Sequence, residues 1–192
     1  MKRIVDLLVS ILGLLILFPV IMIFVFLIYL EDRHNPFYIA KRIGKGGLNF
    51  KMIKLRSMVI NADKNGVDST SINDSRITKI GQKVRKYKLD EIPQLWNVLI
   101  GDMSLVGPRP CLFSQRDLLA ERKARGITMN KPGITGLGQL HGIDMRNPKR
   151  LACLDRRMMS SLSLESYFKY LSKTVCSLIV CKKNVSISKL LS

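Results

Sequence analysis

The sequence predicts an α+β fold, mainly helical, in which an N-terminal membrane helix precedes a small cytoplasmic domain. Three observations support this. A long apolar run opens the chain, two short extended segments flank a glycine-rich turn, and later stretches place apolar residues at helical spacing. We divide the chain into a membrane segment over 1–32, a domain over 33–181 and a basic tail over 182–192.

The apolar run from Leu7 to Leu30 contains no acidic, basic or amide side chain. As a helix it would be about 36 Å long, enough for a hydrocarbon core of ~30 Å. It is longer than the core of a signal peptide, and we find no small-residue cleavage site after it. The segment is therefore predicted to lie in a membrane.

The residues leave the topology of this segment open. Basic side chains lie on both sides of it, and the positive-inside rule draws both flanks toward the cytoplasm. Pro19, near the midpoint, removes a backbone hydrogen bond and favours a kink. A re-entrant hairpin with Asp6 at headgroup level satisfies both flanks. A kinked helix that spans the membrane is equally compatible, since proline is tolerated in membrane helices.

The following domain is predicted to begin with a β-hairpin. Segments 37–40 and 50–56 are extended, and the glycines between them favour a turn. These glycines could also cradle a phosphate, but they lack the order of a nucleotide P-loop. We expect loops over 61–75 and 131–140, and no regular structure over 102–110, where Pro108 and Pro110 exclude helix.

Three helical stretches are predicted after the hairpin, over 76–85, 114–125 and 148–180, in addition to the one described below that ends at Gly101. The first is basic and the second polar. The third has an apolar side and a basic side, a pattern typical of helices on anionic membrane surfaces. Core packing with a solvated face explains the same pattern equally well.

Charge and cysteine content narrow the function classes. The 192 residues include 32 Lys and Arg against 14 Asp and Glu, a formal net charge of +18. Such a balance predicts an anionic partner: a nucleic acid, an acidic membrane surface or a phosphorylated substrate. The membrane segment and the lack of an aromatic-rich RNA-binding pattern argue against nucleic acid. The four cysteines form no CxxC or Cys/His spacing, so we expect free thiols in a reducing cytoplasm and no structural zinc.

Asp90 and Glu91 are the candidate catalytic residues. They follow a basic run and precede apolar residues over 92–100 at helical spacing, which end at Gly101. Pro93 is tolerated only in a first turn, so a helix should begin near Asp90 and its positive end should keep both carboxylates ionised. An ionised carboxylate can serve as a nucleophile or a metal ligand. Acids in a first turn are also ordinary helix capping, so this pattern alone does not assign a function.

The order of several motifs resembles the bacterial sugar transferase family, the small monotopic polyprenyl-phosphate phosphoglycosyl transferases. The resemblance extends from the membrane segment to about Thr174. It is carried by Lys54-Leu55-Arg56-Ser57-Met58, Asp74-Ser75-Arg76-Ile77-Thr78, Arg85-Lys86-Tyr87-Lys88-Leu89-Asp90-Glu91-Ile92-Pro93-Gln94-Leu95, Gly101-Asp102-Met103-Ser104-Leu105-Val106-Gly107-Pro108-Arg109-Pro110 and Lys131-Pro132-Gly133-Ile134-Thr135-Gly136. Here Phe18, Lys88 and Met158 replace a serine, a small hydroxyl residue and a tyrosine of the family pattern. The run 136–143 lacks its Trp, Asn and Arg.

The resemblance implies a reaction and a location. A sugar 1-phosphate passes from a nucleoside-diphosphate sugar, usually UDP-linked, to undecaprenyl phosphate, with release of UMP. This is the first membrane step of surface glycan synthesis, at the cytoplasmic face of the bacterial inner membrane and among its lipids. The family's membrane segment is a re-entrant hairpin bent at a proline.

The resemblance also assigns residues. Asp90 would attack the β-phosphorus and form a phosphosugar-aspartyl intermediate, and Glu91 would deprotonate or orient the lipid phosphate. Mg²⁺ would bridge Asp90 and the diphosphate. Arg85 would hold the polyprenyl phosphate, and the further contributors to the anionic pocket are Lys54, Arg56 and Arg109.

A second hypothesis comes from a different class. It is a membrane-tethered basic protein that binds anionic lipid or nucleic acid without catalysis. The sugar, the glycan pathway and the oligomeric state, a homodimer included, are left open by the sequence.

Overall fold

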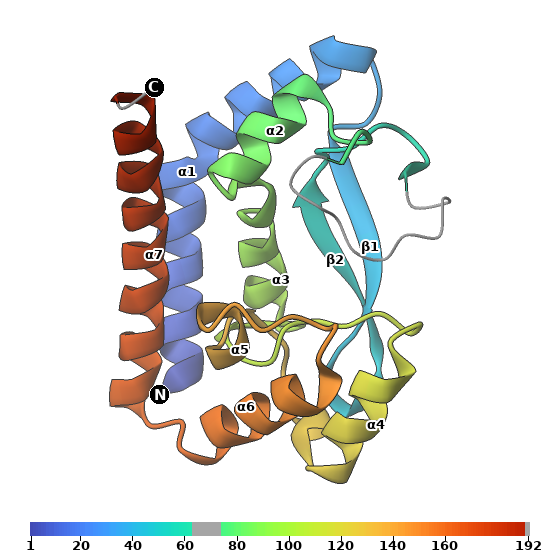
Figure 1. Ribbon diagram of the computed structural model, residues 1–192, viewed down its shortest axis with the longest axis vertical. Helices are drawn as coiled ribbons and strands as arrows, with labels where there is room; N and C mark the ends of the chain where they lie inside the picture. The colour runs from blue at the N-terminus through green and yellow to red at the C-terminus, as the bar shows by residue number, and fades with distance from the viewer. Residues whose placement is uncertain (63–73, 191–192) are drawn as a thin grey trace.

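The computed structural model describes residues 1–62 and 74–190, with side chains as far as residue 177. The loop predicted over 61–75 lies mostly outside the described residues. In chain order the elements are α1 (Lys2–Asp32), β1 (Phe37–Ile43), η1 (Lys45–Gly47), β2 (Asn49–Leu55), α2 (Lys79–Lys86), η3 (Leu89–Glu91), α3 (Gln94–Ile100), β3 (Ser104–Val106), α4 (Arg116–Ala124), η4 (Ile127–Met129), β4 (Gly133–Thr135), α5 (Leu137–Leu140), α6 (Pro148–Ser160) and α7 (Leu164–Leu190). The fold is α+β and mainly helical, as predicted (Figure 1).

The β-hairpin is confirmed. Strands β1 and β2 are antiparallel, with a register that runs from Phe37 opposite Leu55 to Ile43 opposite Asn49. The turn between them contains Gly46 and Gly47 at φ values of 70° and 80°. Glycine adopts this left-handed region without steric cost, which explains why glycines occupy the turn.

The expectation that residues 102–110 contain no regular structure is wrong. Strand β3 pairs in parallel with β4, with Ser104 opposite Gly133 and Val106 opposite Thr135. The prolines exclude helix, but an extended strand that ends before Pro108 is compatible with them. The two backbone segments approach so closely that a Cβ atom at Gly133 would lie 2.0 Å from the backbone nitrogen of Gly107.

The single helix expected over 148–180 is two helices, α6 and α7. The chain leaves helical geometry after Ser160, where a run of serines begins. Ser163 and Ser166 exchange side-chain to backbone hydrogen bonds of 2.8 and 3.1 Å at the start of α7. Serine hydroxyls compete with helical hydrogen bonds in this way. Helix α7 then continues to Leu190 and includes most of the predicted tail.

The main core lies between the hairpin, α3, β3 and the helices that follow. Its buried members include Met52 on β2, Val98 on α3, Met158 on α6 and Tyr167 on α7. A second cluster joins the C-terminal half of α1 to Leu55 and to α2. A third one packs α4 against α6 beside Cys111. These clusters fix the hairpin, α2 and α3 around one region, where the acid pair lies.

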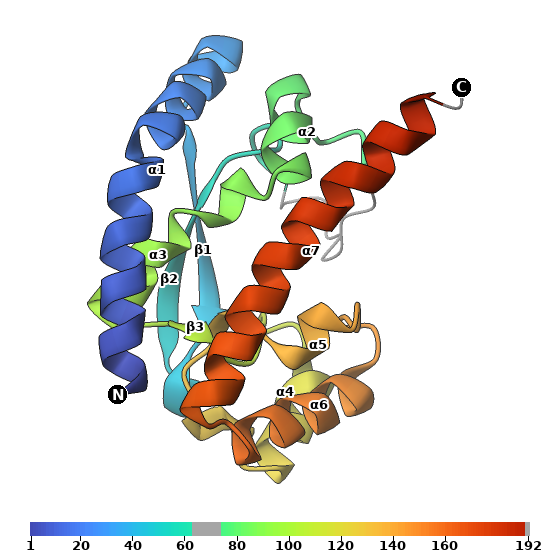
Figure 2. The same ribbon diagram turned by 90° about the vertical axis from the view of Figure 1, so that its left-hand side faces the viewer.

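Helix α1 is long enough and apolar enough to enter a membrane. An 18-residue window has a mean hydropathy of 3.2, and only 11% of that window is buried inside the protein. Figure 2 shows that the helix, which contains Pro19, bends along its length without folding back on itself. Its large exposed side chains are Ile4, Leu8, Val9, Ile11, Leu12, Leu15, Ile16, Phe18, Met22, Ile23, Phe26, Tyr29 and Leu30. A helix in the core of a soluble protein would bury most of these, so the exposed apolar surface of α1 is suited to contact with lipid.

Both ends of α1 are attached to the domain that follows. At the start, buried Asp6 accepts hydrogen bonds of 3.0 Å from the Ser104 hydroxyl and from the Leu105 backbone N–H on β3. At the end, Asp32 forms an ion pair with Arg56 beyond β2. The helix has 31 residues, about 46 Å at ~1.5 Å per residue. It therefore extends along the domain and is attached to it at both termini.

Candidate active site

Asp90 and Glu91 lie in a short 3-10 turn of their own. Lys88 adopts a left-handed conformation, with φ of 52°, immediately before η3. Helix α3 begins only at Gln94, with Pro93 as its N-cap residue. The expected helix start near Asp90 is therefore wrong by a few residues. Pro93 is compatible with the start of α3, but the turn that carries the acids ends before it.

The Glu91 carboxylate is held by two cations from distant segments. Its Oε1 atom lies 3.3 Å from Nζ of Lys54 on β2 and 3.6 Å from Nη2 of Arg109. Burial alone would raise the pKa of Glu91, but Lys54 and Arg109 outweigh it, so the pKa lies below its usual value. Glu91 is thus an ionised group at neutral pH.

The Asp90 carboxylate has a different environment. Burial raises its pKa, the nearby Glu91 charge adds to the rise, and the Lys54 and Arg85 cations oppose it without reversing it. Burial therefore opposes the ionisation that a helix terminus was expected to favour, because desolvation is the larger effect on the pKa of Asp90. In the part of the chain that the structure describes, no side chain forms an ion pair with Asp90. Its carboxylate is available to a ligand.

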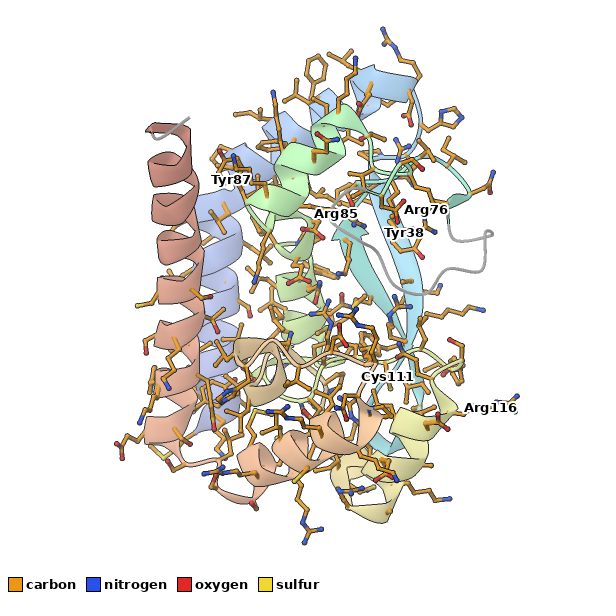
Figure 3. All side chains as sticks on the ribbon, in the orientation of Figure 1. Tyr38, Arg76, Arg85, Tyr87, Cys111 and Arg116 are labelled. Carbon is orange, nitrogen blue, oxygen red and sulfur yellow. The ribbon has the colours of Figure 1, made fainter. Side chains whose placement is uncertain are left out.

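Arg85 lies in the last turn of α2, close enough to Asp90 to act on its pKa. Its Nε atom donates a hydrogen bond of 2.7 Å to the Ser57 hydroxyl. Figure 3 shows Arg85 between α2 and the end of the hairpin, with Arg76 near the same end. The fold thus brings Lys54, Arg85 and Arg109 around the acid pair from three separate segments.

Arg56 does not join this group. Its guanidinium ion-pairs with Asp32, with Nη2 lying 2.6 Å from Oδ1, and its Nε donates to the Asn35 carbonyl at 2.8 Å. The structure therefore places Arg56 at the end of α1, where it attaches the membrane helix to the hairpin. The side chain is only 10% exposed, so these contacts leave little of it for a substrate.

Two residues near the site were missed from the sequence. Arg122 on α4 donates a hydrogen bond of 2.8 Å to the backbone carbonyl of Arg109 and forms a buried ion pair with Asp155 on α6. Ser57 accepts the Arg85 bond described above. Both residues act through partners far away in the sequence, and no local spacing marks them. Two signals were available: Ser57 lies in the motif from Lys54 to Met58, and Asp155 lies in a block that departs from the family pattern.

The acid pair can accept a divalent cation only with help from a substrate. Among residues 1–62 and 74–190, no cluster of three or more His, Cys, Asp or Glu side chains could hold a metal. Mg²⁺ is commonly bound by one or two carboxylates together with substrate phosphates and water. The unpaired carboxylate of Asp90 fits that requirement, whereas Glu91 is already engaged by two cations.

Comparison with known proteins identifies the family. A sequence model described as bacterial sugar transferase matches residues 1–181. A Bacillus subtilis protein, provisionally named undecaprenyl-phosphate N-acetylgalactosaminyl 1-phosphate transferase, is 47% identical over 134 residues, which are 70% of each chain. The UDP-galactose-lipid carrier transferase of Erwinia amylovora is 35% identical over 193 residues, 91% of this chain and 39% of its own.

A third relative is the exopolysaccharide production protein ExoY of Sinorhizobium fredii, 32% identical over 189 residues, 91% of this chain and 83% of its own. The matched regions contain the acid pair and the segments that supply its cations, because the family match covers residues 1–181. The chain therefore belongs to the bacterial sugar transferase family, a family of phosphoglycosyl transferases.

Proposed function

We propose that the protein transfers a sugar 1-phosphate from a UDP-sugar to undecaprenyl phosphate and releases UMP, by way of a covalent intermediate on Asp90. The observation that carries this proposal is the Asp90 carboxylate, which forms no ion pair within the described residues and whose pKa the nearby cations Lys54 and Arg85 lower against the effect of burial. The names of the relatives support the substrates, since they mention undecaprenyl phosphate, a UDP-sugar and exopolysaccharide production.

In the first half-reaction an Asp90 oxygen attacks the β-phosphorus of the donor. The bond from that phosphorus to the bridging oxygen breaks, and UMP leaves with the bond's electrons. Lys54 and Arg85 favour the ionised form of Asp90 that the attack requires. Bound Mg²⁺ would neutralise charge on the diphosphate, with Asp90 as its protein ligand.

In the second half-reaction a phosphate oxygen of the lipid attacks the phosphorus of the adduct, and the Asp90 carboxylate leaves. A phosphate monoester has a second pKa of about 6, so it is mostly dianionic at neutral pH. Glu91, whose pKa is lowered, is a weak base. We therefore assign Glu91 an orienting role: it holds Lys54 and Arg109 where they can meet the two anionic substrates.

The contacts at both ends of α1 support a topology in which the helix enters the membrane without crossing it. Both ends of the helix contact the same domain, so both ends lie on the side of the membrane that holds the domain. We infer that α1 lies in the cytoplasmic leaflet of the inner membrane. Cysteines at positions 2 and 45, introduced as Lys2→Cys and Lys45→Cys in a cysteine-free background, should be labelled from the same face of inverted vesicles. Labelling from opposite faces contradicts this topology.

The reaction is tested with purified protein, Mg²⁺, undecaprenyl phosphate and a panel of UDP-sugars, with UMP as the readout. We expect UMP with at least one donor, and a fall of at least about 10⁴-fold for Asp90→Asn, because an amide cannot attack phosphorus. Absence of UMP with every donor would favour the basic membrane protein without catalysis. Turnover near wild type in Asp90→Asn would remove Asp90 as the nucleophile.

A further inference from the structure

We propose that Ser57 is the positioning residue of Arg85, and that it prepares this arginine for the phosphate of the lipid acceptor. The proposal rests on the function above and adds a residue to it. Ser57 is 7% exposed, and its hydroxyl accepts the Arg85 Nε hydrogen bond at 2.7 Å. A buried hydroxyl that accepts a charge-assisted bond from a guanidinium restricts the orientation of the whole planar group.

The backbone is built to bring these two side chains together. Gly81 and Arg85 lie one helical turn apart, on the same face of α2. A Cβ atom at Gly81 would lie 2.0 Å from the carbonyl oxygen of Ser57, so only glycine permits this contact. The Ser57 carbonyl also accepts the backbone N–H of Thr78, the N-cap residue of α2, at 3.2 Å. Ser57 is thus fixed against the same helix face from which Arg85 extends.

Asp74 holds the adjoining segment from the other direction. Its carboxylate binds Arg76 through two hydrogen bonds of 2.9 and 2.7 Å. Hydrogen bonds from Arg76, with a smaller contribution from the Arg85 charge, lower the pKa of Asp74 to about 2. Asp74 therefore keeps its charge and holds Arg76 in the segment that leads into α2, and within the described residues it forms no ion pair with Arg85. The Asp74 to Thr78 motif, which had no role above, acquires one as the support of this arrangement.

The hydrogen bond to Ser57 leaves the terminal nitrogens of Arg85 available to bind a phosphate. Within the described residues, the bond to Ser57 is the only hydrogen bond of the Arg85 side chain, and it uses Nε. The two terminal nitrogens, Nη1 and Nη2, form the edge that binds a phosphate in bidentate fashion. The Arg85 charge lowers the pKa of Asp90, so the guanidinium lies within electrostatic range of the carboxylate that receives and releases the phosphosugar. Ser57 therefore sets the angle at which a phosphate can be held next to Asp90.

Assays of the two half-reactions distinguish a role of Ser57 in binding the lipid acceptor from a role in the whole reaction. UMP exchange into the UDP-sugar requires only the donor and Asp90, whereas full turnover also requires the lipid phosphate. We expect Ser57→Ala to raise KM for undecaprenyl phosphate about tenfold, the usual effect of losing a hydrogen bond to a charged group. UMP exchange should stay within about twofold of wild type, because Ser57→Ala keeps the Arg85 charge that favours ionised Asp90 and removes no contact with the donor. Ser57→Thr, which keeps the hydroxyl, should restore KM.

Two matched variants complete the test. Ser10→Ala removes a buried hydroxyl that has no hydrogen-bond partner in the described structure, so KM should not change. In an Arg85→Lys background, where Nε is absent, Ser57→Ala should have no further effect. The proposal is overturned if Ser57→Ala leaves KM unchanged, lowers both half-reactions equally, or has its full effect in Arg85→Lys. Absence of UMP exchange in the wild type would instead overturn the proposed function.

Discussion

The buried ion pair between Arg122 and Asp155 gives the sharpest prediction about stability. The two side chains are 6% and 2% exposed, and Asp155 Oδ2 accepts hydrogen bonds of 2.9 and 2.6 Å from Nε and Nη2 of Arg122. Burial raises the pKa of Asp155, and Arg122 offsets this only in part. The intact pair therefore adds little net stability, but either partner left alone would be a buried, uncompensated group.

The magnitude follows from that burial. Asp155→Leu or Arg122→Met should each lower the free energy of unfolding by about 3–5 kcal/mol. For a chain of this size that loss corresponds to a fall in Tm of about 6–20 °C. The double variant Arg122→Met with Asp155→Leu replaces both charges by apolar groups and should cost far less than the sum. The double variant still loses the hydrogen bond from Arg122 to the Arg109 carbonyl, which should cost about 1–3 kcal/mol of stability.

The assay is thermal unfolding of the protein in lipid nanodiscs, followed by far-ultraviolet circular dichroism. The coupling between the two sites, obtained from the double-mutant cycle, should amount to several kcal/mol. Arg116→Met, on the same helix but exposed, is the matched control and should change stability by less than about 0.5 kcal/mol. Single variants with near-wild-type Tm, or a double variant that costs the full sum, would refute this reasoning.

Three further outcomes are expected. Lys54→Met removes a cation that lowers the pKa of Asp90, so the acid limb of the pH–rate profile for UMP release should move to higher pH; an unchanged limb contradicts this. Gly81→Ala should destabilise the fold by about 2 kcal/mol or more, because its Cβ would overlap the Ser57 backbone, whereas the exposed Gln82→Ala should not. EDTA should stop UMP release reversibly without lowering Tm, since the described residues contain no group of side chains that could hold a structural metal ion. Activity in EDTA would exclude the Mg²⁺ requirement.

The sequence was most informative where local chemistry decides the structure. The apolar run of α1 and the glycine turn of the hairpin are set by hydropathy and by φ preferences, and both were predicted correctly. The order of motifs also identified the family, and the structure gathers Lys54, Arg85 and Arg109 around Asp90 and Glu91. That convergence depends on four separate segments and could not be derived from spacing alone.

The misjudged features depend on contacts between distant residues. Arg56 lies two positions from Lys54 and has the same charge, yet its partner is Asp32 on the membrane helix. Strand β3 exists because β4 lies beside it, a pairing that the two short segments do not indicate separately. The pKa of Asp90 is raised by burial, which is a property of the folded chain and not of the local helix pattern.

The covalent adduct tests the central claim most directly. Protein mixed with a UDP-sugar in the absence of lipid, quenched in acid within milliseconds and digested, should yield an Asp90 peptide whose mass is increased by one phosphosugar. The adduct should disappear when undecaprenyl phosphate is added before the quench, and it should not form with Asp90→Asn. Product formation by wild-type protein at a rate that no trapped adduct can account for would contradict the account.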